Sequence, residues 1–140
     1  MGEADNLFGD EHVRVYRETG GETGHLWREG STILLLTTTG RTSGEPRTTP
    51  LIYAQDGDRY VIVASKGGAP EHPGWYENLS KTPDVELQVK ADIFPARART
   101  AEGEEREQLW RKANDVWPHY DEYQTKTDRE IPVVVLDRSA

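Results

Sequence analysis

One stretch of the sequence combines the residue types that bind anions: Thr37–Pro50, with the letters TTTGRTSGEPRTTP. Its glycines, Gly40 and Gly44, would let backbone N–H groups approach an anion, while hydroxyl and guanidinium groups add hydrogen-bond donors. Arginine also has the planar shape that suits phosphate. The same letters are equally typical of an ordinary hairpin turn with surface arginines, so composition alone leaves both interpretations open. The candidate ligands are Arg41, Thr42, Ser43 and Arg47.

A second stretch, Ser65–Tyr76 (SKGGAPEHPGWY), repeats this chemistry. Lys66 precedes Gly67 and Gly68, which places a cation beside backbone without side chains, so a flat ligand or a phosphate could lie close to the chain. The alternative is a long irregular loop that its prolines fold over the core. Since two such loops follow adjacent predicted strands, a binding site is favoured. Micromolar affinity corresponds to about 8 kcal/mol, so contacts from both loops would have to converge.

Three aromatic residues, Trp117, Tyr120 and Tyr123, recur at every third position. On a helix they would lie along one side and could wall a pocket for a flat substrate. Packing in the core is the alternative, and spacing alone favours it. The histidines show no metal-ligand spacing, so we predict no metal site.

The composition limits the classes to which the chain can belong. A length of 140 residues predicts one domain. A net charge of −8 argues against a nucleic-acid partner, which would need a positive field. The absence of cysteine excludes thiol catalysis and disulfides. Since the N-terminus has no apolar leader and no apolar run could span a bilayer, we expect a soluble, cytoplasmic protein without a transmembrane segment.

Hydrophobic patterning predicts the elements that must position these residues. Since several strands are joined by short turns, the sheet should be mainly antiparallel. A regular βαβ alternation is missing, which argues against a Rossmann or flavodoxin fold. An antiparallel barrel or strongly curled sheet with helices at its edges fits best. The expected helices are Asp10–Thr19, Trp75–Lys81, Glu102–Trp117 and a short one in His119–Thr127; the expected strands are Ser31–Thr39, Arg47–Gln55, Arg59–Ser65, two in Val85–Thr100, and Ile131–Asp137.

Three blocks together resemble the deazaflavin (coenzyme F420)-dependent nitroreductase family of actinobacteria: LLLTTTGRTSGEPRTTPLIY, YVIVASKGGAPEHPGWYENL and PHYDEYQTKTDREIPVVVLDR. The resemblance runs in order from about Leu26 to Arg138. It implies a mainly β (α+β) fold, a split β-barrel of the flavin-mononucleotide-binding (FMN-binding) type with about six antiparallel strands and edge helices. Residues 26–140 would form this cofactor-binding domain, and residues 1–25 a helical or irregular N-terminal segment.

The resemblance also implies roles for the candidate residues. Those that would hold the phosphate and acidic tail of coenzyme F420 are Arg41, Thr42, Ser43 and Arg47. Those along the deazaflavin ring would be Ser65, Lys66, Gly67 and Gly68, with Pro50 and Ile52 at its face and Trp75, Tyr76 and Asn78 shaping the pocket. The catalytic group would be Tyr120 and Tyr123, which orient the acceptor and can donate a proton, together with Trp117.

The implied function is an oxidoreductase that uses reduced coenzyme F420 to transfer a hydride to a small, hydrophobic, electron-poor acceptor such as a quinone, enone or nitroaromatic. Trp117 stands where nitro-reducing relatives tend to have tyrosine, which affects nitroimidazole reduction more than quinone or enone reduction. Two alternatives stay open, an FMN-dependent reductase on the same fold and a deazaflavin-binding module without turnover. The fold also leaves a homodimer open.

Overall fold

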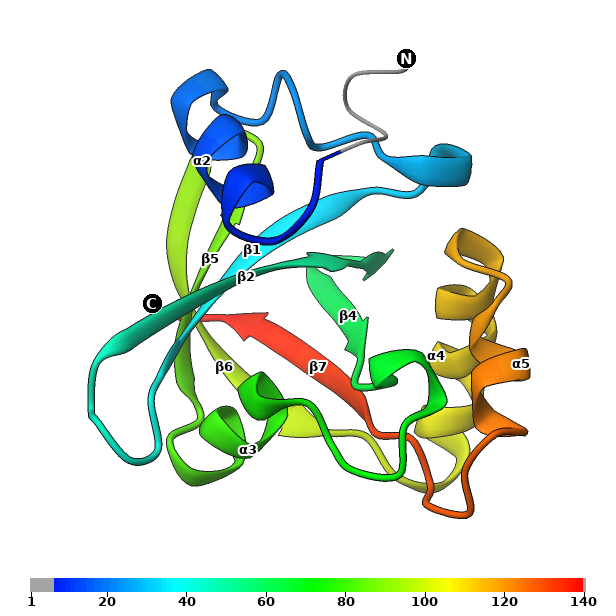
Figure 1. Ribbon diagram of the computed structural model, residues 1–140. Helices are drawn as coiled ribbons and strands as arrows, with labels where there is room; N and C mark the ends of the chain where they lie inside the picture. Colours follow the sequence, from blue (N-terminus) through cyan, green and yellow to red (C-terminus); the bar gives the residue numbers. More distant parts are fainter. Residues whose placement is uncertain (1–6, 140) are drawn as a thin grey trace.

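The computed structural model describes residues 7–139 and forms one curled antiparallel sheet with helices around it (Figure 1). In the described residues the sheet has seven strands in the order β2-β1-β5-β6-β7-β4-β3. The strands are β1 (Ile33–Thr39), β2 (Pro46–Ile52), β3 (Ala54–Asp56), β4 (Arg59–Val63), β5 (Asp84–Val89), β6 (Asp92–Thr100) and β7 (Val133–Arg138). The helices are α2 (Gly9–Thr19), α3 (Gly74–Lys81), α4 (Gly103–Val116) and α5 (Tyr120–Gln124), with short 3-10 turns η1 (Arg28–Gly30) and η2 (Lys66–Gly68).

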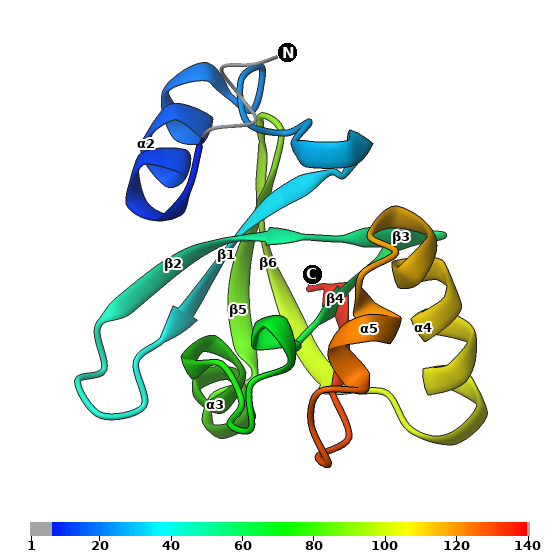
Figure 2. The ribbon, with the colours of Figure 1, turned by 45° about the vertical axis from the view of Figure 1, so that its right-hand side comes forward.

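The two outermost strands of the sheet are neighbours in the chain. Only Tyr53 separates β2 from β3, and Figure 2 shows the two running on from one another across the open side of the barrel. β2 pairs with β1, whereas β3 pairs with β4, so the predicted strand Arg47–Gln55 is in fact two strands. The predicted count of about six strands is therefore one too low for the described residues. The break occurs because the chain changes its pairing partner where the sheet closes on itself.

Two prolines show which edge of β2 is free. Pro46 lies opposite Thr39 and Pro50 opposite Leu35, so both occupy the strand that borders the split of the barrel. A proline has no backbone N–H to donate to a neighbouring strand, so proline is found in edge strands, where that side of the strand has no neighbour. The open edge of β2 is therefore encoded in the sequence.

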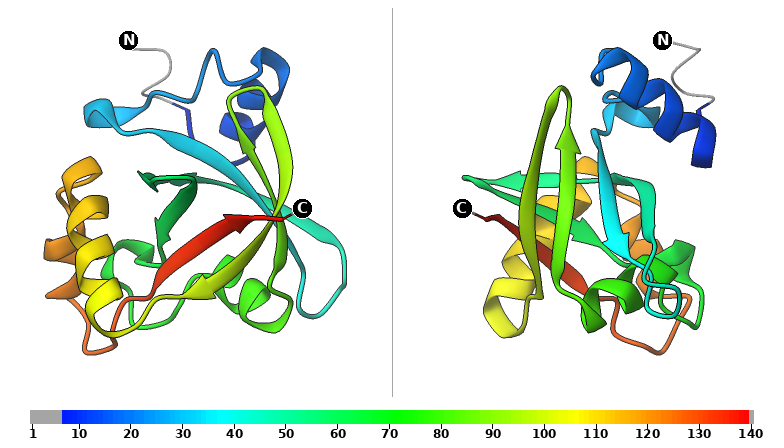
Figure 3. Two further views of the ribbon diagram at one scale, coloured as in Figure 1. Left: turned by 180° about the vertical axis from the view of Figure 1, so that it is seen from behind. Right: turned by 90° about the vertical axis from the view of Figure 1, so that its left-hand side faces the viewer.

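The core has two layers. Inside the barrel, side chains such as Leu34, Ile62 and Leu136 are almost completely buried. A second layer, which includes Val133 and Leu109, fills the space between the sheet and α4. The apolar run at the end of the chain is explained by this arrangement, because β7 is covered on both faces (Figure 3).

Helix α2 packs on the outer side of β1. Val13 and the fully buried Tyr16 contact Ile33 and Leu35. The Tyr16 hydroxyl donates a hydrogen bond to the Ile33 carbonyl oxygen at 2.9 Å. The N-terminal helix is thereby fixed against the barrel.

An ionic cluster of five side chains attaches α4 to the sheet. Arg99 Nη1 lies 2.8 Å from Glu105 Oε1, and Arg59 Nη1 lies 3.1 Å from Glu105 Oε2. Asp56 pairs with Arg59 and, at 2.6 Å, with Lys112 Nζ. Hydrogen bonds from Arg99 and then Arg59 lower the pKa of Glu105 to about 2, so its carboxylate stays ionised down to strongly acidic pH.

Candidate active site

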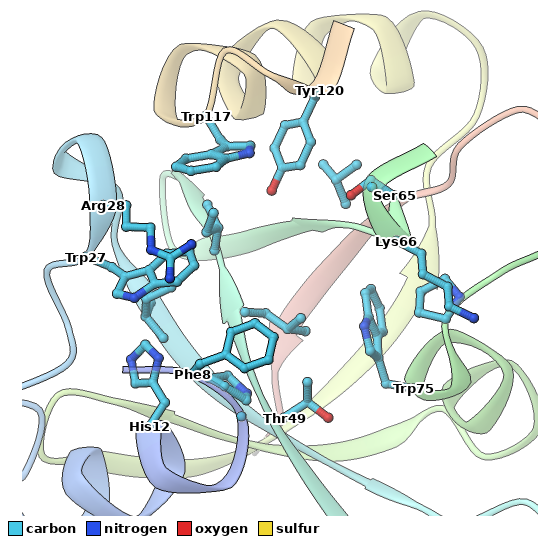
Figure 4. A pocket seen from close by; sticks show the side chains of 18 of the residues that line it. Phe8, His12, Trp27, Arg28, Thr49, Ser65, Lys66, Trp75, Trp117 and Tyr120 are labelled. Atoms are coloured by element: carbon cyan, nitrogen blue, oxygen red, sulfur yellow. The ribbon is translucent and has the colours of Figure 1, made fainter. Parts of the chain in front are cut away.

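A cavity of about 450 Å³ lies at the split of the barrel, between the open edge of β2 and the chain that follows β4 (Figure 4). Trp117 directly after α4, helix α5 and the segment around α2 supply its other walls. Its volume is in the range of small-molecule binding sites. Nine of the candidate residues line it: Pro50, Ile52, Ser65, Lys66, Gly67, Trp75, Trp117, Tyr120 and Tyr123.

The loop after β4 has an unusual backbone. Ser65 is right-handed (φ −80°), and Lys66, Gly67 and Gly68 follow with φ of 48°, 64° and 87°. Such a right-to-left succession forms a concave set of N–H groups that binds anions. A positive φ is costly for a lysine, and strain of this kind is typical of functional sites.

Gly68 serves a different purpose from its neighbours. It does not line the cavity, and a Cβ atom there would lie only 2.7 Å from the Tyr123 carbonyl oxygen. A side chain at this position would therefore push α5 away. Gly68 allows the loop that carries Lys66 to pack directly on the helix that carries Tyr123.

Arg129 holds this loop in place, and sequence reasoning missed it. Its guanidinium donates hydrogen bonds to the carbonyl oxygens of Ala69 (2.9 Å), Ser65 (2.9 Å) and Ala64 (3.3 Å). A fourth contact joins Nη1 to Nδ1 of His72 at 2.9 Å, in which the imidazole nitrogen must accept. Arg129 therefore satisfies three backbone carbonyl groups of the Lys66 loop.

The other candidate anion loop, between β1 and β2, is anchored to α3. Asn78 is buried, and its Oδ1 accepts hydrogen bonds from Nη1 (2.8 Å) and the backbone N–H (3.1 Å) of Arg41. Its Nδ2 donates to Thr38 Oγ1 at 3.1 Å. Asn78 therefore orients Arg41 rather than reaching the cavity, and Arg41 also forms an ion pair with Glu77 at 3.3 Å.

The remaining candidates lie outside the cavity. Thr42 and Ser43 are exposed on the β1–β2 loop, where Ser43 Oγ accepts a hydrogen bond from the Glu45 backbone, and Arg47 is exposed at the start of β2. Tyr76 shares a hydrogen bond of 2.8 Å between its hydroxyl and that of Thr100. The structure thus brings the Ser65–Gly67 loop and the aromatic group together, but not the second loop.

Aromatic rings from two distant segments meet across one end of the cavity. Trp27 stacks on Trp117, with ring centres 6.0 Å apart. Trp117 Nε1 donates to the Tyr123 hydroxyl at 3.3 Å. Trp117 and Tyr120 also belong to the core layer beneath α4. These two side chains therefore pack in the core and line the cavity at the same time.

The Tyr120 hydroxyl points into the cavity (Figure 4). The side chain is buried, yet no protein partner binds its oxygen in residues 7–139. Across that same part of the chain, Arg106 Nε is the one fully buried side-chain nitrogen or oxygen without a hydrogen-bond partner, so the Tyr120 oxygen must reach open space. Burial raises the pKa of Tyr120, which keeps the hydroxyl protonated and able to donate.

Sequence reasoning also missed the wall supplied by the N-terminal region. Phe8, His12, Trp27 and Arg28 line the cavity opposite Lys66 and belong to segments that the motifs do not include. One signal was available: His12 lies on the same helical face as Val13 and Tyr16, so its burial could have been expected.

Residues 7–139 contain no group of three or more histidine or acidic side chains arranged to hold a metal ion. Within the same residues, none of the helices combines the length and the apolar character needed to cross a bilayer.

A family model described as F420H(2)-dependent quinone reductase matches residues 9–138. The chain belongs to the F420H(2)-dependent quinone reductase family. The predicted resemblance to the deazaflavin (coenzyme F420)-dependent nitroreductase family is therefore confirmed through this F420H(2)-dependent family, and with it coenzyme F420 as the cofactor of the family. The match begins within α2, so the family pattern includes most of the wall that the motifs left out.

A curated relative and two solved structures support this assignment. The F420H(2)-dependent quinone reductase Rv1261c of Mycobacterium tuberculosis H37Rv is 46% identical over 130 residues, which cover 91% of this chain and 87% of that protein. A solved F420-H2-dependent reductase has 48% identity and a TM-score of 0.71, over 75% of this chain and 93% of its own. A solved domain-swapped dimer has 44% identity and a TM-score of 0.73, over 89% and 92%. The predicted split-barrel fold is confirmed.

Proposed function

We propose that this chain binds reduced coenzyme F420 at the split of the barrel and reduces a small, hydrophobic, electron-poor acceptor, with a quinone as the first candidate. One observation carries the proposal. A single cavity places the Lys66 loop on one wall and the Trp117–Tyr123 aromatic group on another. In a chain of this family, those walls have the chemistry for an anionic, ring-shaped cofactor and for a flat acceptor.

The residues present fit the cofactor. The right-to-left backbone succession at Ser65 and Lys66 offers N–H groups to an anionic group. Among residues 7–139 Lys66 has only a weak partner, Glu71 at 3.8 Å, and its side chain is 48% exposed, so its charge is available to a ligand. Pro50 and Ile52 add apolar surface for a ring. The exposed Arg47 and the anchored Arg41 lie outside the cavity, where they would meet the acidic tail.

When bound, the reduced deazaflavin supplies the hydride. The chain contributes orientation, exclusion of water and hydrogen bonding. The Trp27–Trp117 stack closes one end of the cavity and offers flat apolar surface to an acceptor. Tyr120 would donate a hydrogen bond to the acceptor carbonyl, stabilising the negative charge that develops on its oxygen.

Tyr123 is the second donor. Because its hydroxyl oxygen accepts the Trp117 indole N–H, its own proton is free to point elsewhere. Tyr120, whose hydroxyl has no protein partner in residues 7–139, is the more direct of the two. We therefore assign Tyr120 as the principal hydrogen-bond donor to the acceptor and Tyr123 as its support.

The test follows oxidation of reduced F420 by absorbance with a quinone, an enone and a nitroaromatic, and repeats it with reduced FMN. We expect turnover with F420 and a quinone, reduced about a hundredfold in Tyr120→Phe. Tyr60→Phe is the matched control, since Tyr60 packs against the barrel core and does not line the cavity. Tight F420 binding without turnover would instead indicate a binding module, and faster turnover with FMN would indicate the alternative reductase.

A homodimer is part of the proposal, supported by the domain-swapped dimer among the similar structures. Light scattering on the purified chain would measure its mass against the 15.8 kDa of one copy. A monomer at micromolar concentration would contradict this part alone. The proposed compartment is the cytoplasm, which the cysteine-free composition supports.

A further inference from the structure

His12 is a buried imidazole on the cavity wall opposite Lys66. Only 2% of the residue is exposed, and Figure 4 shows its ring beside Phe8 and Trp27. Its ring centre lies 5.9 Å from that of Trp27. The roles given above to the cofactor loop and the tyrosines leave this polar group unused.

The tautomer of His12 follows from its hydrogen bond. Nε2 lies 2.9 Å from the Gly24 carbonyl oxygen, which can only accept, so Nε2 carries the proton. Burial lowers the pKa of His12, and the bond to Gly24 only partly opposes this. The ring is therefore neutral at physiological pH, and Nδ1 presents a lone pair.

This lone pair faces open space. In residues 7–139 no side chain or backbone group forms a hydrogen bond with Nδ1. In the same residues, the one fully buried side-chain nitrogen or oxygen without a hydrogen-bond partner is Arg106 Nε, so Nδ1 is not fully enclosed. Since His12 lines the cavity and is otherwise buried, the space that Nδ1 reaches is the cavity. A buried acceptor of this kind is costly to leave without a donor.

We propose that His12 Nδ1 accepts a hydrogen bond from a hydroxyl group on the acceptor and so determines which acceptors the enzyme prefers. The inference rests on the proposed function. Tyr120 presents a donor to the same cavity, and His12 presents an acceptor. The pair matches a molecule that carries both a reducible carbonyl and a hydroxyl substituent, such as a hydroxyalkyl quinone. His12 is a specificity residue in this assignment and takes no part in moving the hydride.

The experiment compares kcat/KM for two naphthoquinones that differ in one substituent, hydroxymethyl against ethyl. We expect the native chain to prefer the hydroxymethyl compound by about three- to tenfold, the effect of one neutral hydrogen bond. In His12→Gln the amide can still donate to Gly24, but no acceptor remains at the Nδ1 position, so the preference should disappear while the melting temperature changes little. His12→Asn should show the reverse, a retained preference with a lower melting temperature.

His25→Gln is the matched control. His25 is half-buried and, like His12, is bonded through Nε2, here to the Tyr53 hydroxyl at 2.8 Å, but it does not line the cavity. Its substitution should leave the preference unchanged.

Two results would overturn the inference while leaving the proposed function standing: equal kcat/KM for the two quinones in the native chain, or an unchanged ratio in His12→Gln. If neither quinone oxidises reduced F420 in the native chain, the proposed function fails, and the role of His12 falls with it.

Discussion

The loop that carries Lys66 and the ionic cluster around Glu105 use charge in opposite ways. Within the described part of the chain Lys66 has one ionic partner, at 3.8 Å, and it lies on strained backbone at the edge of a cavity. Glu105 has two arginine partners within 3.1 Å and lies in the first turn of a regular helix. A charge whose partners within the protein satisfy it stabilises the fold, whereas a charge left with a weak partner remains available to a ligand.

Arg129 connects these two uses of charge. It is a cation satisfied by carbonyl groups of the protein, as in the ionic cluster, yet those carbonyls belong to the cofactor loop. Its removal should therefore affect both stability and binding, and it offers the most severe test of the contrast.

The largest effect is expected for Arg129→Ala. Three carbonyl groups and His72 would lose a charged donor, so we expect the free energy of unfolding to fall by about 3 kcal/mol and the affinity for F420 to fall more than tenfold. Chemical denaturation and fluorescence titration measure the two. Arg97→Ala, which removes one exposed ion pair with Asp84, is the control and should change neither. Unchanged F420 affinity in Arg129→Ala would show that the Lys66 loop keeps its binding conformation without Arg129.

Lys66→Ala should act on binding alone. We expect F420 affinity to fall about ten- to a hundredfold, equivalent to about 1.5–3 kcal/mol for a charged hydrogen bond, with a nearly unchanged melting temperature. Lys112→Ala is the matched control, because Lys112 belongs to the ionic cluster and lies away from the cavity. A loss of melting temperature with native affinity would remove Lys66 from the cofactor site.

Glu105→Gln should act on stability alone, by about 1 kcal/mol near neutral pH, since the cluster is partly exposed. The pKa of Glu105 is lowered in the folded state, so its contribution is complete above the ordinary carboxylate pKa and is lost as pH falls toward about 2. The difference in melting temperature between the native chain and Glu105→Gln should therefore narrow between roughly pH 5 and pH 3, where the Glu105 carboxylate of the unfolded chain becomes protonated. A difference in melting temperature that does not narrow, or a change in F420 affinity, would contradict the assignment of Glu105 to stability alone.

The smallest effect is expected for Trp117→Tyr. The swap removes the indole donor to Tyr123 and part of the surface that stacks on Trp27. We expect the ratio of kcat/KM between quinone and nitroaromatic acceptors to change by a few-fold, on the order of 1 kcal/mol, with F420 affinity retained. A change in F420 affinity larger than the change in this ratio would place Trp117 on the cofactor side.

Most of the fold could be predicted from local patterns. The strand of Ile33–Thr39, the hairpin of Asp84–Thr100 and helix α4 all lie within about two residues of their predicted bounds, because hydrophobic periodicity is a local property. The break at Tyr53 could not be predicted. It depends on which strand pairs with each half of the segment, and that is decided by closure of the barrel.

The sequence by itself determined which residue types form the Lys66 wall, since a lysine before two glycines is a local arrangement. Only the tertiary structure decided what faces that wall. His12, Trp27 and Trp117 lie far apart in the chain and meet because α2 packs on β1 and α4 packs on the far side of the sheet. Arg129 likewise reaches its carbonyl partners across some sixty intervening positions. Side-chain polarity can be read from each position alone, but convergence on a cavity depends on long-range packing, which no local pattern contains.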